Sequence, residues 1–181
     1  MDAAFRGSIT LIVGGMFASK SDKLISHLKR SGIAKLSCIA FRPARDTRQD
    51  NVCSRTGSEF EAISVAHASE IPALAAQAQV VGIDEAQFFG DDLRDAIFLM
   101  AQRGQRVFVA ALNADFGAKP FDSISPLYAI ATQIEHVHAV CVDCGEEANF
   151  SQRLVASAEQ VVVGDREYKA CCLRCYEPPS S

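Results

Sequence analysis

A glycine-containing stretch near the N-terminus has the residue types to hold a phosphate group. Residues 14–21, GGMFASKS, match the phosphate-loop pattern G-x-x-x-x-G-K-[ST] at Gly14, Lys20 and Ser21. Ser19 stands where the pattern has its second glycine. In such a loop backbone N–H groups face phosphate oxygens, the lysine reaches the β- and γ-phosphates, and the hydroxyl binds Mg²⁺. A plain strand–turn–helix is the alternative, and this segment alone does not decide between them.

Two adjacent carboxylates, Asp84 and Glu85, follow the apolar run VVGI. The carboxyl end of a parallel strand faces the ligand crevice of an open α/β sheet. One carboxylate can support Mg²⁺ there while the other faces a second substrate, because side chains alternate along a strand. Taken alone, the pair is equally typical of a solvated acidic turn. Together with the upstream loop, it favours a nucleotide site.

Two C-x-x-C pairs, Cys141–Cys144 and Cys172–Cys175, predict a metal site. Four thiolates complete a tetrahedral Zn²⁺ site and leave no coordination position open, so the zinc would be structural. The separation of the pairs exceeds that of a usual zinc ribbon and predicts an inserted loop. Cys171 is an alternative ligand, although the spacing of the first pair favours Cys172. Reduced cysteines without metal are the other interpretation.

Hydrophobic patterns predict the elements that position these residues. Short apolar runs predict buried strands at 8–13, 36–41, 80–84 and 106–112. Helices are predicted at 20–30 and at 91–103, the second with one apolar face and Gly104 as its stop. Residues 42–57 show neither period and predict a loop. Alternating strands and helices indicate an α/β fold with a mostly parallel sheet.

The chain divides where its character changes near residue 136. We expect a phosphate-loop α/β domain at 1–135, a zinc-binding module at 136–176 and a disordered tail at 177–181. Beyond the strand at 106–112, Phe116 and Phe121 could cover a flat base or simply pack. His136 and His138 precede the first cysteine pair; they could ligate zinc, and more often such residues face solvent.

Composition narrows the class of protein. The chain has 181 residues, 49% of them hydrophobic, and a formal net charge of −4. The absence of a basic excess argues against a general nucleic-acid binder. The apolar run from Ile9 to Val13 is too short for a signal peptide or a membrane span, which predicts a cytoplasmic protein without a membrane partner.

In combination, these segments resemble the type II thymidine kinases of vertebrate cytosol, many bacteria and large DNA viruses. The matching segments occur in the family's order between residues 8 and 176: GGMFASKS, RPARDTR, GIDEAQFF, VFVAALNADFGAKPF, AVCVDCGEEANFSQR and VVVGDREYKACCLRCY. The resemblance implies an enzyme that transfers the γ-phosphate of ATP to the 5′-hydroxyl of thymidine, using Mg²⁺. It also implies a structural Zn²⁺ and a homotetramer.

The resemblance assigns roles to individual residues. Glu85 matches the catalytic base, and Arg48 offsets charge as the phosphoryl group moves. The residues matching the cofactor site are Gly14, Gly15, Met16, Phe17, Ala18, Ser19, Lys20, Ser21, Asp46, Thr47, Arg48, Asp84 and Gln87. Those matching the nucleoside site are Met16, Phe88, Leu112, Phe116, Phe121, Val161, Val162, Val163 and Tyr168. The three valines belong to a flexible loop at about 153–168 that closes over thymine and is anchored by the zinc module.

Three positions depart from the family's pattern. Ser19 replaces a glycine, Asp22 replaces a small polar residue beside the phosphates, and Val163 replaces the first glycine of the flexible loop. These departures motivate a second hypothesis, a catalytically weak or inactive thymidine-kinase-like domain that acts as an assembly or regulatory partner. A zinc-ribbon nucleic-acid binder is a third hypothesis, disfavoured by the acidic net charge.

Overall fold

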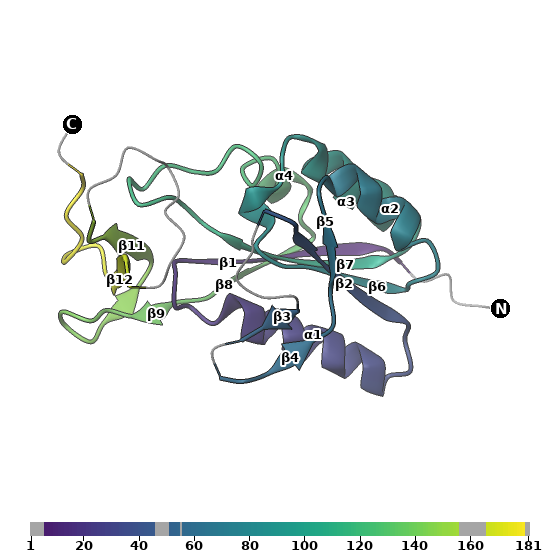
Figure 1. Cartoon of the computed structure of the whole chain (residues 1–181), viewed down its shortest axis with the longest axis horizontal. Helices are drawn as coiled ribbons and strands as arrows, with labels where there is room; N and C mark the ends of the chain where they lie inside the picture. Colours follow the sequence, from purple (N-terminus) through teal and green to yellow (C-terminus); the bar gives the residue numbers. More distant parts are fainter. Residues whose placement is uncertain (1–5, 46–50, 55, 156–165, 180–181) are drawn as a thin grey trace.

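A six-stranded parallel sheet forms the centre of the protein. The structure is a computed structural model that describes residues 6–45, 51–54, 56–155 and 166–179. The strand order is β5-β2-β6-β7-β1-β8, and every neighbouring pair runs parallel (Figure 1). The strands are β1 (Ser8–Gly14), β2 (Cys38–Pro43), β5 (Ile63–Val65), β6 (Val80–Ile83), β7 (Arg106–Leu112) and β8 (Gln133–His136). The predicted α/β fold with a mostly parallel sheet is confirmed.

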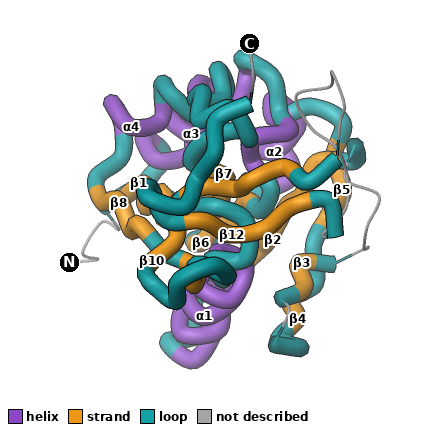
Figure 2. Tube along the Cα trace, turned by 90° about the vertical axis from the view of Figure 1, so that its left-hand side faces the viewer, coloured by secondary structure: helices purple, strands orange, loops and turns teal. Residues whose placement is uncertain are grey.

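Helices cover both faces of this sheet. Figure 2 shows α1 (Lys20–Ile33) on one face and α2 (Ile71–Leu74), α3 (Asp92–Gln102) and α4 (Leu127–Ile130) on the other. Successive residues of β1 serve the two layers: Leu11 packs with the α3 side, while Ile12 packs with Leu24 and Leu28 of α1. Burial on both faces explains why the central strands read as continuous apolar runs.

A small module lies at one end of the sheet, beyond the carboxyl ends of its strands (Figure 1). It contains two antiparallel pairs, β9 with β10 and β11 with β12. The bounds are β9 (Ala139–Val140), β10 (Glu147–Ala148), β11 (Phe150–Arg153) and β12 (Tyr168–Cys171). A separate hairpin of β3 (Val52–Cys53) and β4 (Glu59–Phe60) lies beside α1.

Most predicted elements are present with shifted ends. The four predicted strands correspond to β1, β2, β6 and β7, and the two predicted helices to α1 and α3. The loop predicted at 42–57 is wrong at its start, where β2 continues to Pro43, and in its interior, where Val52–Cys53 pairs with β4. The short edge strands β5 and β8 are not among the four predicted apolar strands, and β8 carries the polar sequence QIEH.

Two contacts or boundaries concern the predicted division of the chain. The last strand of the main sheet, β8, ends at His136. Near the C-terminus, the backbone N–H of Glu177 donates a hydrogen bond to Gln152 Oε1 at 2.8 Å. Across the described ranges, no helix has the length and apolar character required to cross a membrane.

Candidate active site

The phosphate loop joins the end of β1 to the start of α1. Ser19, the N-cap of α1, has φ 55° and ψ 33°, and Phe17 has φ 66°. Glycine adopts this left-handed region freely, whereas a residue with a Cβ is strained there. The Ser19 side chain is exposed and makes no capping hydrogen bond. The backbone therefore keeps a glycine-type turn at the position where the pattern expects glycine.

Ser21 and Asp84 connect the loop to the end of β6. Ser21 Oγ donates to Asp84 Oδ2 at 2.9 Å, and Lys20 Nζ donates to the Gly15 carbonyl at 2.7 Å. Burial raises the pKa of Asp84 to about 7, aided by the negative charge of Glu85 and opposed by the Ser21 hydrogen bond. A hydroxyl and a carboxylate oxygen this close are donors that Mg²⁺ prefers, so these residues fit that ion.

Glu85 follows directly and has a different environment. It begins the 3-10 turn η2 (Ala86–Phe88) with φ 48° and ψ 39°, a strained backbone for a residue other than glycine. Asp84 is buried, whereas Glu85 is half-buried. Gln87 Nε2 donates to Glu85 Oε2 at 2.5 Å. The two adjacent carboxylates are thus separated into one buried group beside Ser21 and one accessible group held by Gln87.

The four cysteines of the two C-x-x-C pairs lie together in the small module. The Sγ atoms of Cys141, Cys144, Cys172 and Cys175 lie within 4.8 Å of one another. Tetrahedral coordination at Zn–S distances of about 2.3 Å requires S···S separations of about 3.8 Å, which this cluster can reach. Backbone N–H groups, foremost that of Cys172, lower the pKa of Cys141 to about 6, whereas the side chains of Cys144 and Cys172 raise the pKa of Cys175 to about 12.

Cys171 has a different partner, although it is adjacent in sequence. Its Sγ lies 3.6 Å from Asp143 Oδ2, and burial raises its pKa to about 11. The cluster therefore uses Cys172, as the spacing of the first pair predicted.

The cysteine module packs directly against the phosphate loop. Ala18 is buried in one apolar cluster with Ala148, Ala170 and two of the cysteines. The Met16 N–H donates to Ser151 Oγ on β11 at 2.9 Å. These contacts span residues far apart in sequence and were not predicted.

The loop backbone lies too close to its neighbours for larger residues. A Cβ added at Gly14 would lie 2.2 Å from the Val137 carbonyl oxygen, and one at Gly15 would lie 3.2 Å from that of Asn149. Gly14 therefore has no room for a side chain, and the loop's position depends on the module that covers it.

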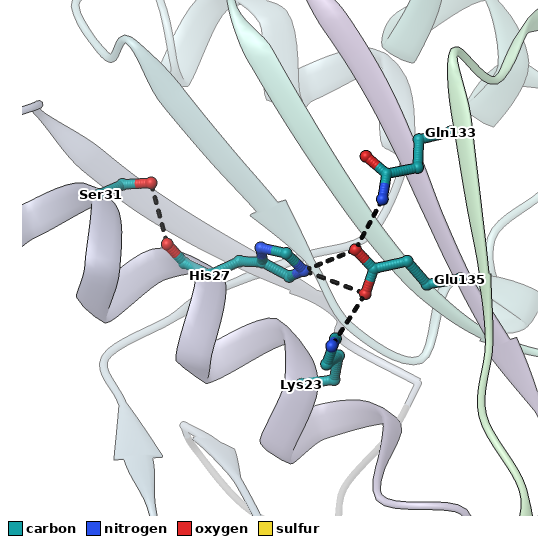
Figure 3. A network of polar contacts seen from close by, with 5 residues as sticks. All are labelled: Lys23, His27, Ser31, Gln133 and Glu135. Atoms are coloured by element: carbon teal, nitrogen blue, oxygen red, sulfur yellow. Dashed lines mark hydrogen bonds and ion pairs between the residues drawn. The ribbon is translucent and has the colours of Figure 1, made fainter.

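A polar network connects α1 with β8, the edge strand next to β1 (Figure 3). His27 Nε2 lies 3.1 Å from both carboxylate oxygens of Glu135 on β8, and Lys23 Nζ lies 3.4 Å from one of them. Gln133 donates to the same carboxylate at 3.1 Å. Because Lys20 is in the first turn of the same helix, this network helps to set the position of the phosphate loop.

Comparisons with known proteins agree with this geometry. The family model described as Thymidine kinase matches residues 7–176. A protein of Bacteroides thetaiotaomicron named thymidine kinase is 40% identical over 174 residues, covering 94% of this chain and 87% of that protein. One of Chloroflexus aurantiacus with the same name is 41% identical over 184 residues, covering 95% of each.

The chain belongs to the thymidine kinase family.

In this family member, two of the expected nucleoside-site residues, Phe116 and Tyr168, contact an arginine that was not predicted. The Arg153 guanidinium carbon lies 3.5 Å from the centre of the Phe116 ring, and Arg153 donates to the Tyr168 hydroxyl at 3.1 Å. Arg153 belongs to the segment ANFSQR, which carried the resemblance without giving this residue a role. A cation stacked on an aromatic face is held in one orientation, so this contact joins β11 firmly to the loop after β7.

The other expected nucleoside-site residues occupy different layers. Met16, Phe88 and Leu112 are half-buried, on the phosphate loop, on η2 and at the end of β7. Phe121 is 6% exposed and belongs to the main apolar core. Its side chain therefore packs within the core.

Several predicted site residues lie outside the described residues: Asp46, Thr47, Arg48, Val161, Val162 and Val163.

Asp22, one of the three positions that depart from the family's pattern, accepts a hydrogen bond from the Thr56 hydroxyl and so connects α1 to the β3–β4 hairpin. The rings of His136 and His138 lie 4.9 Å apart, and neither residue belongs to the cysteine cluster.

Proposed function

We propose that this protein is a thymidine kinase that transfers the γ-phosphate of ATP to the 5′-hydroxyl of thymidine. The hydrogen bond between Ser21 and Asp84 carries the proposal, because it joins the helix after the phosphate loop to the strand end that bears Glu85. Membership of the thymidine kinase family supports the choice of substrates. A phosphate cradle and an accessible carboxylate at one sheet edge are the parts that phosphoryl transfer needs.

The phosphate loop binds and orients the triphosphate. Backbone N–H groups from Phe17 to Ser21 and the positive end of α1 face the phosphates. Lys20 exchanges its bond to the Gly15 carbonyl for the β- and γ-phosphates. When bound, Mg²⁺ neutralises charge on the transferred phosphoryl group. Ser21 and Asp84 would hold that ion, and Asp84 would have to be ionised to do so.

Glu85 acts as the general base. Its accessible carboxylate accepts the proton of the 5′-hydroxyl as the oxygen attacks the γ-phosphorus in line. Met16, Phe88 and Leu112 line the nucleoside site, and Arg153 stacks on the ring of Phe116, a further residue expected there. Val161, Val162 and Val163 read thymine through their backbone groups, and Arg48 offsets charge at the phosphates.

Further parts of the proposal concern metal, assembly and location. The four clustered cysteines hold a structural Zn²⁺, since their number and spacing suit a closed tetrahedral site. We further propose a homotetramer in the cytoplasm, on the ground of the family alone. Residues 136–176 act as the module that both anchors the thymine-binding loop and supports the phosphate loop.

A direct assay tests the reaction. Purified protein is incubated with ATP, Mg²⁺ and labelled thymidine, and thymidine 5′-monophosphate is measured. We expect turnover with thymidine, none with 5′-deoxythymidine, and a rate at least about 100-fold lower for Glu85→Ala. If the wild-type protein forms no more product than Glu85→Ala, the result favours the inactive, assembly-type relative.

A further inference from the structure

We propose that Gln87 is a positioning residue that holds the Glu85 carboxylate in its reactive orientation. This inference rests on the proposed role of Glu85 as general base. The resemblance places Gln87 among the cofactor residues, whereas in the structure its side-chain amide is turned toward Glu85 and the end of β7.

The amide of Gln87 is held at both ends. The Leu112 N–H donates to Gln87 Oε1 at 3.1 Å, and Gln87 Nε2 donates to Glu85 Oε2 at 2.5 Å. A backbone N–H can only donate, so the oxygen of the amide must face Leu112 and its NH₂ group must face Glu85. The hydrogen-bond pattern thus leaves one orientation for this side chain.

The surroundings make Gln87 a rigid support. Gln87 is 6% exposed, and its backbone carbonyl accepts a hydrogen bond from Ser123 Oγ at 3.3 Å. Leu112 is the last residue of β7, a central strand paired on both sides. Gln87 therefore positions the Glu85 carboxylate relative to the central sheet rather than relative to a loop.

Glu85 needs such a support because its own backbone is strained. Its φ of 48° is in the left-handed region, and its side chain is half-buried. A strained conformation persists only where the surroundings over-determine it. A general base must lie within hydrogen-bond reach of the proton it accepts, and a misplacement of about 1 Å can lower the rate about 100-fold.

The bridge also connects the base with the nucleoside site. Leu112 is one of the residues expected to line that site, and Gln87 joins its backbone to Glu85. A short chain of hydrogen bonds therefore connects the Glu85 carboxylate with the backbone of a residue expected to line the nucleoside site.

Two variants distinguish the hydrogen bond that Gln87 donates to Glu85 from the one that it accepts from Leu112. Gln87→Leu removes both hydrogen bonds at similar size. Gln87→Glu keeps an acceptor for the Leu112 N–H; when ionised, it has no proton to donate to Glu85 and repels that carboxylate. This variant also covers the case in which Gln87→Leu fails to fold. We expect kcat to fall about 100-fold in both variants, with KM for thymidine and for ATP within about threefold of the wild-type values.

Gln105→Leu is the matched control. Gln105 is also 6% exposed and donates to two backbone carbonyls, those of Ala75 and Ala78, each at 2.8 Å. It lies at the opposite end of β7 from Leu112. Its substitution should lower the thermal midpoint and leave kcat unchanged.

A double-mutant cycle with Glu85→Ala completes the test. If Gln87 acts through Glu85, adding Gln87→Leu to Glu85→Ala lowers the residual rate by less than about twofold. The inference would be overturned if the two substitutions lowered the rate independently, or if Gln87→Leu raised KM for ATP and kept kcat. The second result would assign Gln87 to the cofactor. Wild-type activity in Glu85→Ala alone would instead remove the proposed base and the inference with it.

Discussion

Replacing Ser19 by glycine should stabilise the ligand-free protein. Ser19 has φ 55°, and a left-handed conformation costs a residue with a Cβ about 1–2 kcal/mol. Glycine avoids that cost, but it loses about 0.5–1 kcal/mol more conformational entropy on folding. The Ser19 side chain makes no capping hydrogen bond, so its removal forfeits no cap. The expected net stabilisation is about 0.5–1 kcal/mol.

Thermal unfolding of the ligand-free protein measures this effect. For a chain of this length, about 1 kcal/mol shifts the midpoint by about 2–4 °C, so Ser19→Gly should raise it by about 1–4 °C. The loop backbone already has the conformation that glycine adopts freely, and KM for ATP should therefore change by less than about threefold.

Two control variants separate backbone from side-chain effects. Lys35 also has a positive φ, 61°, and lies just after α1 rather than in the phosphate loop. Lys35→Gly should therefore stabilise the protein similarly and leave the kinetics unchanged. Ser19→Ala keeps the strained Cβ and should not stabilise. A lower midpoint for Ser19→Gly would refute the reasoning from the backbone, and a tenfold gain in activity would identify the serine as a catalytic defect.

Three further predictions follow from the site. Burial raises the pKa of Asp84 from 3.8 to about 7, so the folded protein binds this proton more tightly than the unfolded chain does. The free energy of unfolding in Mg²⁺-free buffer should therefore fall as pH rises from about 4 to about 7. Urea unfolding at a series of pH values measures this decrease, and the contribution of Asp84 to it should be absent in Asp84→Asn. Removing the proposed zinc with a chelator should weaken binding of a fluorescent ATP analogue by about tenfold, because Ala18 and Met16 contact the module that contains the four cysteines. An unchanged affinity after chelation would contradict this. Arg153→Ala should raise KM for thymidine by about tenfold and leave KM for ATP unchanged, since it removes the stack on Phe116.

Local patterns in the sequence predicted those parts of the fold that are buried on both faces. Strands such as β1 and β7 are mostly apolar because helices cover both sides of the sheet. The spacing of the cysteine pairs predicted the cluster, since each C-x-x-C turn presents two thiols on one side. The phosphate-loop pattern and the strand-end carboxylates predicted that Ser21 and Asp84 would lie near one another.

The contacts that sequence patterns missed are tertiary and polar. Met16 and Ser151 are joined by one hydrogen bond across 135 positions, and no period in the chain marks either residue. Arg153 stacks on Phe116 only because β11 and the loop after β7 meet in space. The role of Gln87 depends on which way its amide faces, and that is set by the backbone of another strand.

The central claim is that residues 14–21 hold a triphosphate while Glu85 faces the primary alcohol of a nucleoside. A crystal structure with thymidine and a non-hydrolysable ATP analogue tests it most directly, through the distance between the Glu85 carboxylate and the thymidine 5′-oxygen. We predict a separation of about 2.6–3.2 Å, with the phosphates bound by the loop N–H groups. A carboxylate turned away from the 5′-oxygen, or phosphates displaced from the loop by the Ser19 side chain, would contradict the account.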